Sequence, residues 1–215
     1  MKTQLTKRSL IALALIAMLA SSAGAAVLHD QSSYGAWGAG FLNAVAGGPP
    51  FGGTSYSVND VTVTGTGWSI ESISIIVNAL GDYPDNTTTA YVNVFPKTGP
   101  LPTDVPGTGT PVAVSVTSVG GDDYMVTASG LNIELEPGDY WIGLTPAASD
   151  LFAGIHIPSD TLIGDATPSY DPNGFPVPMW LNQVPDTDAT ILIEGDDQVV
   201  ATENVSMGSV KALFR

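Results

Sequence analysis

The sequence predicts an all-β protein, a jelly-roll-like antiparallel β-sandwich, on three observations. The β-branched residues Val, Ile and Thr are abundant together with Gly, Ser and Pro, whereas the helix-favouring Lys, Arg and Glu are scarce. Short apolar runs recur along the chain between clusters of Gly, Pro, Asn and Asp, which is typical of a sandwich or a barrel. Several runs alternate with a period of two, so one face of each strand is expected to lie on a core.

The first 25 residues match the three parts of a secretory signal peptide. Lys2, Lys7 and Arg8 form the charged region, residues 9–20 are an apolar run, and residues 23–25 are small residues at a cleavage site. The apolar run is shorter than the about 20 residues that span a membrane. We therefore expect cleavage after residue 25 and a secreted, extracellular or cell-surface location. A retained anchor or a buried helix is the alternative.

The chain is expected to have four parts. Residues 1–25 are the signal peptide, 26–53 an N-terminal strand with a Gly-rich loop, 54–196 the β-sandwich, and 197–215 a linker with a C-terminal tail. The mature chain of about 190 residues is long enough for one domain with a sizeable core. No further apolar stretch reaches membrane-spanning length, so we expect no membrane span in the mature form.

Turn-forming clusters separate ten expected strands. Residues 136–139, with the sequence Glu-Pro-Gly-Asp, predict the turn of a hairpin, because Pro and Gly readily adopt turn dihedral angles. The apolar period slips between Ile70 and Ile73, which predicts a β-bulge near Glu71 and Ser72. The expected strands are residues 56–64, 68–78, 89–95, 111–117, 124–128, 132–136, 140–145, 151–157, 176–181 and 190–194, and the expected loops are residues 38–53, 97–111 and 159–175.

Charge excludes several classes of partner. Lys97 is the only basic residue between Arg8 and Lys211, against 21 Asp and Glu residues in the whole chain. Nucleic acids and anionic membrane surfaces are bound by clustered Lys or Arg, so neither is an expected partner. With one cation in the body, we expect stability to come from apolar sheet packing and not from salt bridges, which leaves the carboxylates to water or cations.

Four segments together resemble a β-sandwich domain found in exported bacterial proteins with PEP-CTERM or other interchangeable C-terminal anchors. They are residues 27–31 (Val-Leu-His-Asp-Gln), residues 59–73 with Asn-Asp-Val-Thr-Val and Trp-Ser-Ile-Glu-Ser-Ile, residues 135–144 with Leu-Glu-Pro-Gly-Asp-Tyr-Trp-Ile-Gly-Leu, and residues 191–195 ending in Gly. The resemblance implies a sandwich fold and export. Asn59 and Val61 stand where the family has Asp and Phe, and the Pro-Glu-Pro anchor motif is absent from residues 197–215.

The tail at residues 203–215 is similar to short C-terminal tails of the Trp-Gly-x-Ile-Lys-x-x-Tyr-Arg type, with Met in place of Trp. A sorting or attachment tag is one interpretation. A frayed terminus, or a short helix that packs on its own domain, is the other. The residues of this tail are Met207, Gly208, Val210, Lys211, Leu213, Phe214 and Arg215.

Calcium is the cofactor that the residues suggest. Asp-rich loops between strands suit a hard cation that binds 6–8 oxygen ligands, and the absence of Cys excludes thiolate sites. The same Asp and Asn residues often stabilise the turn itself, which is the alternative. The candidate ligands are Asp186, Asp188, Asp171 and Asn173.

Carbohydrate binding and catalysis have separate candidates. Exposed aromatic faces could stack on sugars, and Trp180, Tyr170, Trp141 and Trp37 are the residues available, although an aromatic residue on a sandwich strand is more often part of the core. His156 alternates with apolar residues and is expected to point outward from a strand. A Ser-His-Asp set stays open, because such triads assemble from distant positions.

These observations predict a non-enzymatic, exported or cell-surface-associated β-sandwich protein with a structural or adhesive role, with calcium as a stiffening ion. A carbohydrate-binding module is the alternative, and a secreted hydrolase with a carboxylate pair is a third class. The expected partners are a surface or matrix component or a polysaccharide.

Overall fold

A computed structural model describes residues 25–36, 39–46, 54–79, 82–148, 154–172, 179–181 and 184–198. The expected signal peptide up to residue 24, Trp37, Asn173 and the tail residues 203–215 lie outside these ranges. Among the described residues, no helix is long and apolar enough to cross a membrane.

The all-β prediction is confirmed, since strands form nearly all of the regular structure and the one described helix has four residues. The elements in chain order are β1 (Ala26–Asp30), β2 (Phe41–Leu42), β3 (Val45–Ala46), β4 (Tyr56–Ser57), β5 (Asn59–Val63), β6 (Trp68–Asn78), α2 (Tyr83–Asn86), β7 (Thr87–Pro96), β8 (Val112–Gly120), β9 (Asp123–Leu135), β10 (Gly138–Ala148), β11 (Ile155–His156), β12 (Ser169–Asp171), β13 (Met179–Leu181) and β14 (Leu192–Asp197).

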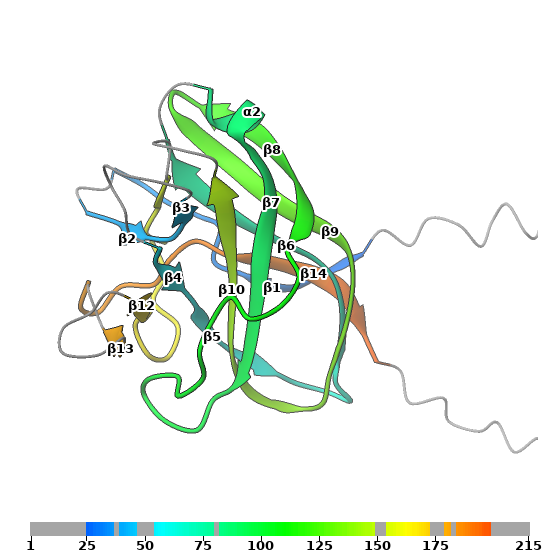
Figure 1. Ribbon diagram of the computed structural model, residues 1–215. Helices are drawn as coiled ribbons and strands as arrows, with labels where there is room; N and C mark the ends of the chain where they lie inside the picture. Colours follow the sequence, from blue (N-terminus) through cyan, green and yellow to red (C-terminus); the bar gives the residue numbers. More distant parts are fainter. Residues whose placement is uncertain are drawn as a thin grey trace, which may run out of the picture.

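Eleven of these strands form one sheet that curls into a nearly closed, barrel-like shape (Figure 1). Its main order is β1-β14-β6-β9-β8-β7-β10-β3, while β5 also pairs with β10 and β11 pairs with β6 and β2. All pairs are antiparallel except that of β3 with β10. Strand β8 connects the two halves, because its first two residues pair with β7 and residues from Val114 onward pair with β9.

The main core lies between the half formed by β6, β9 and β14 and the half formed by β5, β7 and β10. Inward side chains of both halves pack there, and burial of this apolar area is the principal stabilising term. The alternation expected from the sequence is confirmed, because three sets of residues pack on this core: Val112, Val114 and Val116; Leu131, Ile133 and Leu135; and Tyr140, Ile142 and Leu144.

A second apolar cluster lies on the outer face of β10 and β7. Trp141 is directed there, because it alternates with the inward-facing Tyr140 and Ile142. A small sheet of order β13-β12-β4 covers it, and Tyr56, Tyr170 and Trp180 of that sheet pack in this cluster (Figure 1). The protein therefore has a third layer outside the barrel-like sheet.

The predicted bulge is confirmed. The pairing of β6 with β9 shifts between Ile70 and Ser72, and the pairing of β14 with β6 shifts between Glu194 and Gly195. One extra residue in β6 changes the inward positions from even to odd numbers, so that both Ile70 and Ile73 are buried.

Several expected boundaries are wrong, and the hairpin expected around residues 136–139 does not form, because β9 pairs with β6 and β8 whereas β10 pairs with β3, β5 and β7. Residues 124–128 and 132–136 belong to one continuous strand, β9, because Gly130 adopts a φ of +69° and lets the strand bend without ending. β2, β3 and β12 fall in segments expected to be loops. These strands are only two or three residues long, and they are held by neighbours that are distant in sequence.

The small sheet lies so close to β10 that no side chain fits at Gly143. A methyl group there would overlap the carbonyl oxygen of Ser57 and contact Val58. We therefore expect Gly143→Ala to lower the free energy of unfolding by about 1–3 kcal/mol through overpacking. Gly109→Ala is the control, because nothing lies within 4 Å of the added carbon. Urea denaturation compares the two variants, and equal midpoints would show that the third layer is not packed on β10 in this way.

Candidate functional site

The predicted aromatic platform is wrong for the three candidates that the structure describes. Trp141, Tyr170 and Trp180 are only 0%, 9% and 7% exposed, so their faces are not available to a sugar. They are covered because the small sheet and the loop at residues 97–111 pack over them, and Asp104 O accepts a hydrogen bond of 2.8 Å from Trp180 Nε1. Their role is to join the outer layer to β10.

The predicted calcium ligands are not assembled into a site by the described part of the chain. Asp186 is exposed at a turn with a φ of 53°, whereas Asp188 is fully buried. The backbone of Asp171 pairs with Met179. Within the described ranges, no group of three or more His, Cys, Asp or Glu side chains could hold a metal ion. Calcium binding therefore stays a prediction.

Asp188 instead belongs to a group of buried, hydrogen-bonded polar side chains that we call the seam. Its central members are Gln31, which follows β1, Asn59 in β5, and Asp188. Asp188 Oδ2 accepts hydrogen bonds from Gln31 Nε2 at 2.6 Å and from the Ile163 amide at 2.7 Å. Its Oδ1 is buried without a hydrogen-bond partner among the described residues. Burial and, to a smaller extent, the nearby Asp60 carboxylate raise the pKa of Asp188 to about 6, although the hydrogen bonds from Ile163 and Gln31 oppose this shift.

Gln31 and Asn59 form the centre of the same seam. Gln31 Oε1 accepts from Asn59 Nδ2 at 3.1 Å and lies 2.8 Å from His29 Nε2. Asn59 Nδ2 also donates to Ala189 O at 2.6 Å, and Asn59 Oδ1 accepts from Thr167 Oγ1 at 3.0 Å. These amides satisfy backbone and side-chain groups that would otherwise be buried unpaired, which would be costly. The sequence predicted no role for either amide, although Asn59 is a polar residue at the start of β5.

Lys97 forms a second cluster with Asp60, Asp165 and Trp141, which we call the Lys97 cluster. Its Nζ lies 2.6 Å from Asp60 Oδ2, 2.8 Å from Asp165 Oδ2 and 4.8 Å from the centroid of the Trp141 ring. The side chains of Lys97 and Asp60 are only 18% and 10% exposed, and that of Asp165 is 48% exposed. Burial lowers the pKa of Lys97, but the two carboxylates outweigh this effect and raise it above its usual value.

The Lys97 cluster corrects the expectation that no ion pair would stabilise the body. The single basic residue of the body follows β7 directly, and its amide donates to Asp139 O at 2.8 Å. Its ammonium reaches β5 at Asp60 and, with Asp165, the loop before β12. Because Asp60 is nearly buried, breaking this pair should lower the stability more than breaking an exposed pair, which contributes about 0–1 kcal/mol.

A short turn lies between the two buried carboxylates. The Ile163 amide donates to Asp188 and the Asp165 amide donates to Asp60 Oδ2 at 3.0 Å. Gly164, between them, has a φ of +74°, and a side chain there would overlap the Asp60 carboxylate. Only Gly allows this close approach. The seam and the Lys97 cluster are therefore connected through residues 163–165.

The prediction that His156 points outward is wrong. It is buried in β11, between β2 and β6, with its Nε2 2.6 Å from Thr190 O and its Nδ1 2.9 Å from Ser57 Oγ and 3.1 Å from Asn43 Nδ2. A carbonyl only accepts, so Nε2 carries the proton and Nδ1 accepts from Ser57 and Asn43. Burial lowers the pKa of His156 to about 4, although the contact with Thr190 O opposes this.

Ser57 and His156 lie at the distance of a nucleophile and its base, but their surroundings are those of a core. Both are almost fully buried, and His156 Nε2 faces a backbone carbonyl and not a carboxylate. Asn43 Nδ2 also donates to His156 Nδ1, and Asn43 Oδ1 accepts from Thr145 Oγ1 at 2.7 Å. These hydrogen bonds pair the polar groups that are buried between β4, β10 and β11.

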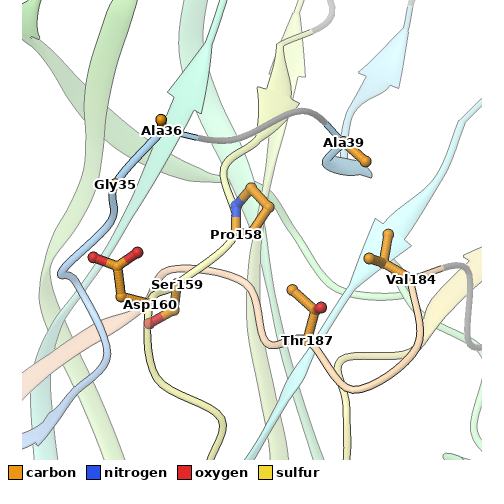
Figure 2. Close-up of a pocket in the computed structure, with 8 residues that line it drawn as sticks. All are labelled: Gly35, Ala36, Ala39, Pro158, Ser159, Asp160, Val184 and Thr187. Atoms are coloured by element: carbon orange, nitrogen blue, oxygen red, sulfur yellow. The ribbon is translucent and has the colours of Figure 1, made fainter.

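A pocket of about 270 Å³ lies on the surface near the seam (Figure 2). Figure 2 shows Pro158 at its centre, with the Asp160 carboxylate directed towards the backbone at Gly35. A Cβ atom at Gly35 would lie 3.1 Å from Asp160 Oδ1. The residues that line the pocket are Gly35, Ala36, Ala39, Pro158, Ser159, Asp160, Val184 and Thr187.

The buried ion pair predicts a large effect of removing Lys97. Lys97→Met keeps the apolar stem near Trp141 but leaves the nearly buried Asp60 carboxylate without its cation. We expect the free energy of unfolding to fall by about 2–4 kcal/mol in urea denaturation. Adding Asp60→Asn should recover most of this loss, and Asp165→Asn alone should cost less than about 1 kcal/mol, because Asp165 is half exposed. Equal effects of the Lys97 and Asp165 variants would contradict this account.

The raised pKa of Asp188 predicts a pH dependence of definite sign. The folded protein holds this proton more tightly than the unfolded chain, so the contribution to stability is complete below pH 3.8 and is lost as the pH rises to about 6. Asp188→Asn keeps an oxygen acceptor but does not titrate. The unfolding free energy of the variant minus that of the wild type should therefore rise by about 2–3 kcal/mol between pH 4 and pH 7.5. Asp186→Asn, on the same loop but exposed, should show no such rise; a decrease for Asp188→Asn would overturn the assignment.

The comparisons with known proteins found no match to this chain among family models, curated proteins or solved structures. Arguments about function therefore depend on the residues and the geometry described above.

Proposed function

We propose that this protein is exported and acts as a non-enzymatic structural or adhesive module at the cell surface or in the surrounding matrix. The observation that carries this proposal is that several described side chains of the kinds used in catalysis are buried and hold segments of the fold together. His156, Ser57 and Asp188 are buried and hydrogen-bonded, and Lys97 is paired with two carboxylates. A module that acts by display needs a rigid body and an available surface, and it needs no reactive group.

The outer face of the main sheet supports the same proposal. Side chains of adjacent strands are hydrogen-bonded to one another there: Ser74 with Thr127 at 2.8 Å, Ser72 with Glu194 at 2.8 Å, and Ser69 with Glu134 at 2.7 Å. These pairs make the face polar and ordered. Since Lys97 is the only Lys or Arg between Arg8 and Lys211, the described surface has no free basic side chain. A neutral or cationic partner fits such a surface.

We interpret the barrel-like sheet as a flattened jelly-roll-like sandwich, because its two halves face each other across one core. The resemblance of residues 27–31, 59–73, 135–144 and 191–195 to exported bacterial sandwich domains supports the same interpretation and the proposed location.

Cell fractionation tests the location and the tail together. The full chain, expressed in a bacterial host with its own N-terminus, should appear outside the cytoplasm. Its mass should match a chain that starts at residue 26. A variant that lacks residues 203–215 should move from the cell-associated fraction to the medium if the tail attaches the protein, and an unchanged distribution would give the tail a structural role. Retention of the full chain in the cytoplasm with residues 1–25 intact would refute the proposal.

A further inference from the structure

The described residues that line the pocket beside Pro158 present side-chain acceptors and no free side-chain donor. The Asp160 carboxylate has no ion pair and accepts no hydrogen bond within the described part of the chain. The hydroxyl of Ser159 already donates to Ser33 O at 3.3 Å, and it accepts from the Thr161 amide. The hydroxyl of Thr187 donates to Pro185 O at 3.0 Å. The lone pairs that remain at Asp160 and Thr187 are therefore available to a ligand that donates.

The rest of the lining is apolar and small. Ala36, Ala39, Pro158 and Val184 form surfaces against which a short alkyl stem could pack. Anionic ligands are disfavoured, because Asp160 is on the pocket and the described surface offers no free Lys or Arg to balance a second negative charge. Among the described residues that line the pocket there is no aromatic ring on which a sugar could stack.

We propose that this pocket binds an alkylammonium or guanidinium group, with Asp160 as its counter-ion and Thr187 as a second acceptor. The stem of such a group lies against Pro158 and Val184, and its charge lies beside the carboxylate near Gly35. This inference goes beyond the proposed role in display and does not depend on export, because it concerns the chemistry of one pocket in the folded protein.

Two sources could supply this group. One is a separate molecule or partner with an accessible Lys, Arg or amine. The other is a second copy of this chain, in which Lys211 and Arg215 are the Lys and Arg residues that follow Lys97 in the sequence. Lys97 itself is excluded, because its ammonium is held by Asp60 and Asp165.

Binding measured by NMR titration of the purified protein tests the pocket. Butylammonium and butylguanidinium are the cationic probes, butanol is the neutral probe of the same stem, and methyl glucoside is the sugar probe. We expect the cationic probes to shift the amide signals of Gly35, Ser159 and Thr187, with weak affinity that is lost in high salt. Stronger binding of butanol or methyl glucoside than of butylammonium would overturn the proposal.

Matched variants locate the charge. Asp160→Asn should weaken butylammonium binding about fivefold, because a charge contact at about 4 Å in water is worth about 1 kcal/mol. Asp196→Asn removes the same charge at an exposed residue at the end of β14 and should leave the affinity unchanged. Both substitutions are at exposed positions, and their melting temperatures report whether the fold is intact. An equal loss in both variants would show a general charge effect and would refute a pocket at Asp160.

The source is identified with a peptide of residues 203–215. If a second copy supplies the group, this peptide should bind more tightly than butylammonium, and its Lys211→Gln, Arg215→Gln form should not bind. If the peptide binds no more tightly than butylammonium, the group comes from a separate partner. If neither the peptide nor any cationic probe binds, the pocket has no such function, and the fractionation result for the proposed function is unaffected.

Discussion

The contact between the Lys97 ammonium and the Asp60 carboxylate is the interaction on which the arrangement of the layers depends. Asp60 is on β5, Lys97 follows β7, Asp165 precedes β12, and the ring of Trp141 on β10 lies beside the ammonium. One cation therefore links β5, the end of β7, β10 and the loop that leads to β12 in the small outer sheet. In a chain with so few basic residues, no other Lys or Arg nearby in the sequence could replace it.

Around this contact, polar side chains of the kinds used in catalysis or metal binding form hydrogen bonds that hold segments of the fold together. Asp60 and Asp188 each receive a backbone amide of the turn at residues 163–165, and Gly164 allows that turn to approach. His156 joins β11 to the carbonyl of Thr190 and to Ser57. Short strands such as β4 and β11 have little ladder hydrogen bonding of their own, so side-chain bonds of this kind stabilise their positions. The acidic surface and the pocket beside Pro158 remain available for contact with other molecules.

Local patterns predicted the elements that depend on local physics. The period-two alternation in β8, β9 and β10 identified the inward side chains, because alternate residues of a strand point to opposite faces whatever lies on them. The phase slip in β6 predicted the bulge for the same reason. The short strands β2, β3 and β12 were not predicted, because two or three residues contain too little periodicity and each strand pairs with a segment distant in the sequence. The outward direction predicted for His156 failed because its ring lies against Asn43, Ser57 and Thr190, which belong to other segments of the chain.

The sequence by itself determined the all-β class, the position of the bulge, the inward faces of the long strands and the near absence of positive charge. These follow from composition and from periodicity within single segments. The tertiary structure alone decided what each conspicuous side chain does. Trp141, Tyr170 and Trp180 are buried because a separate small sheet covers the outer face of β10, and a strand's own sequence does not reveal whether its second face is covered. Likewise, Lys97, Asp60 and Asp165 become one cluster only when segments far apart in the chain meet.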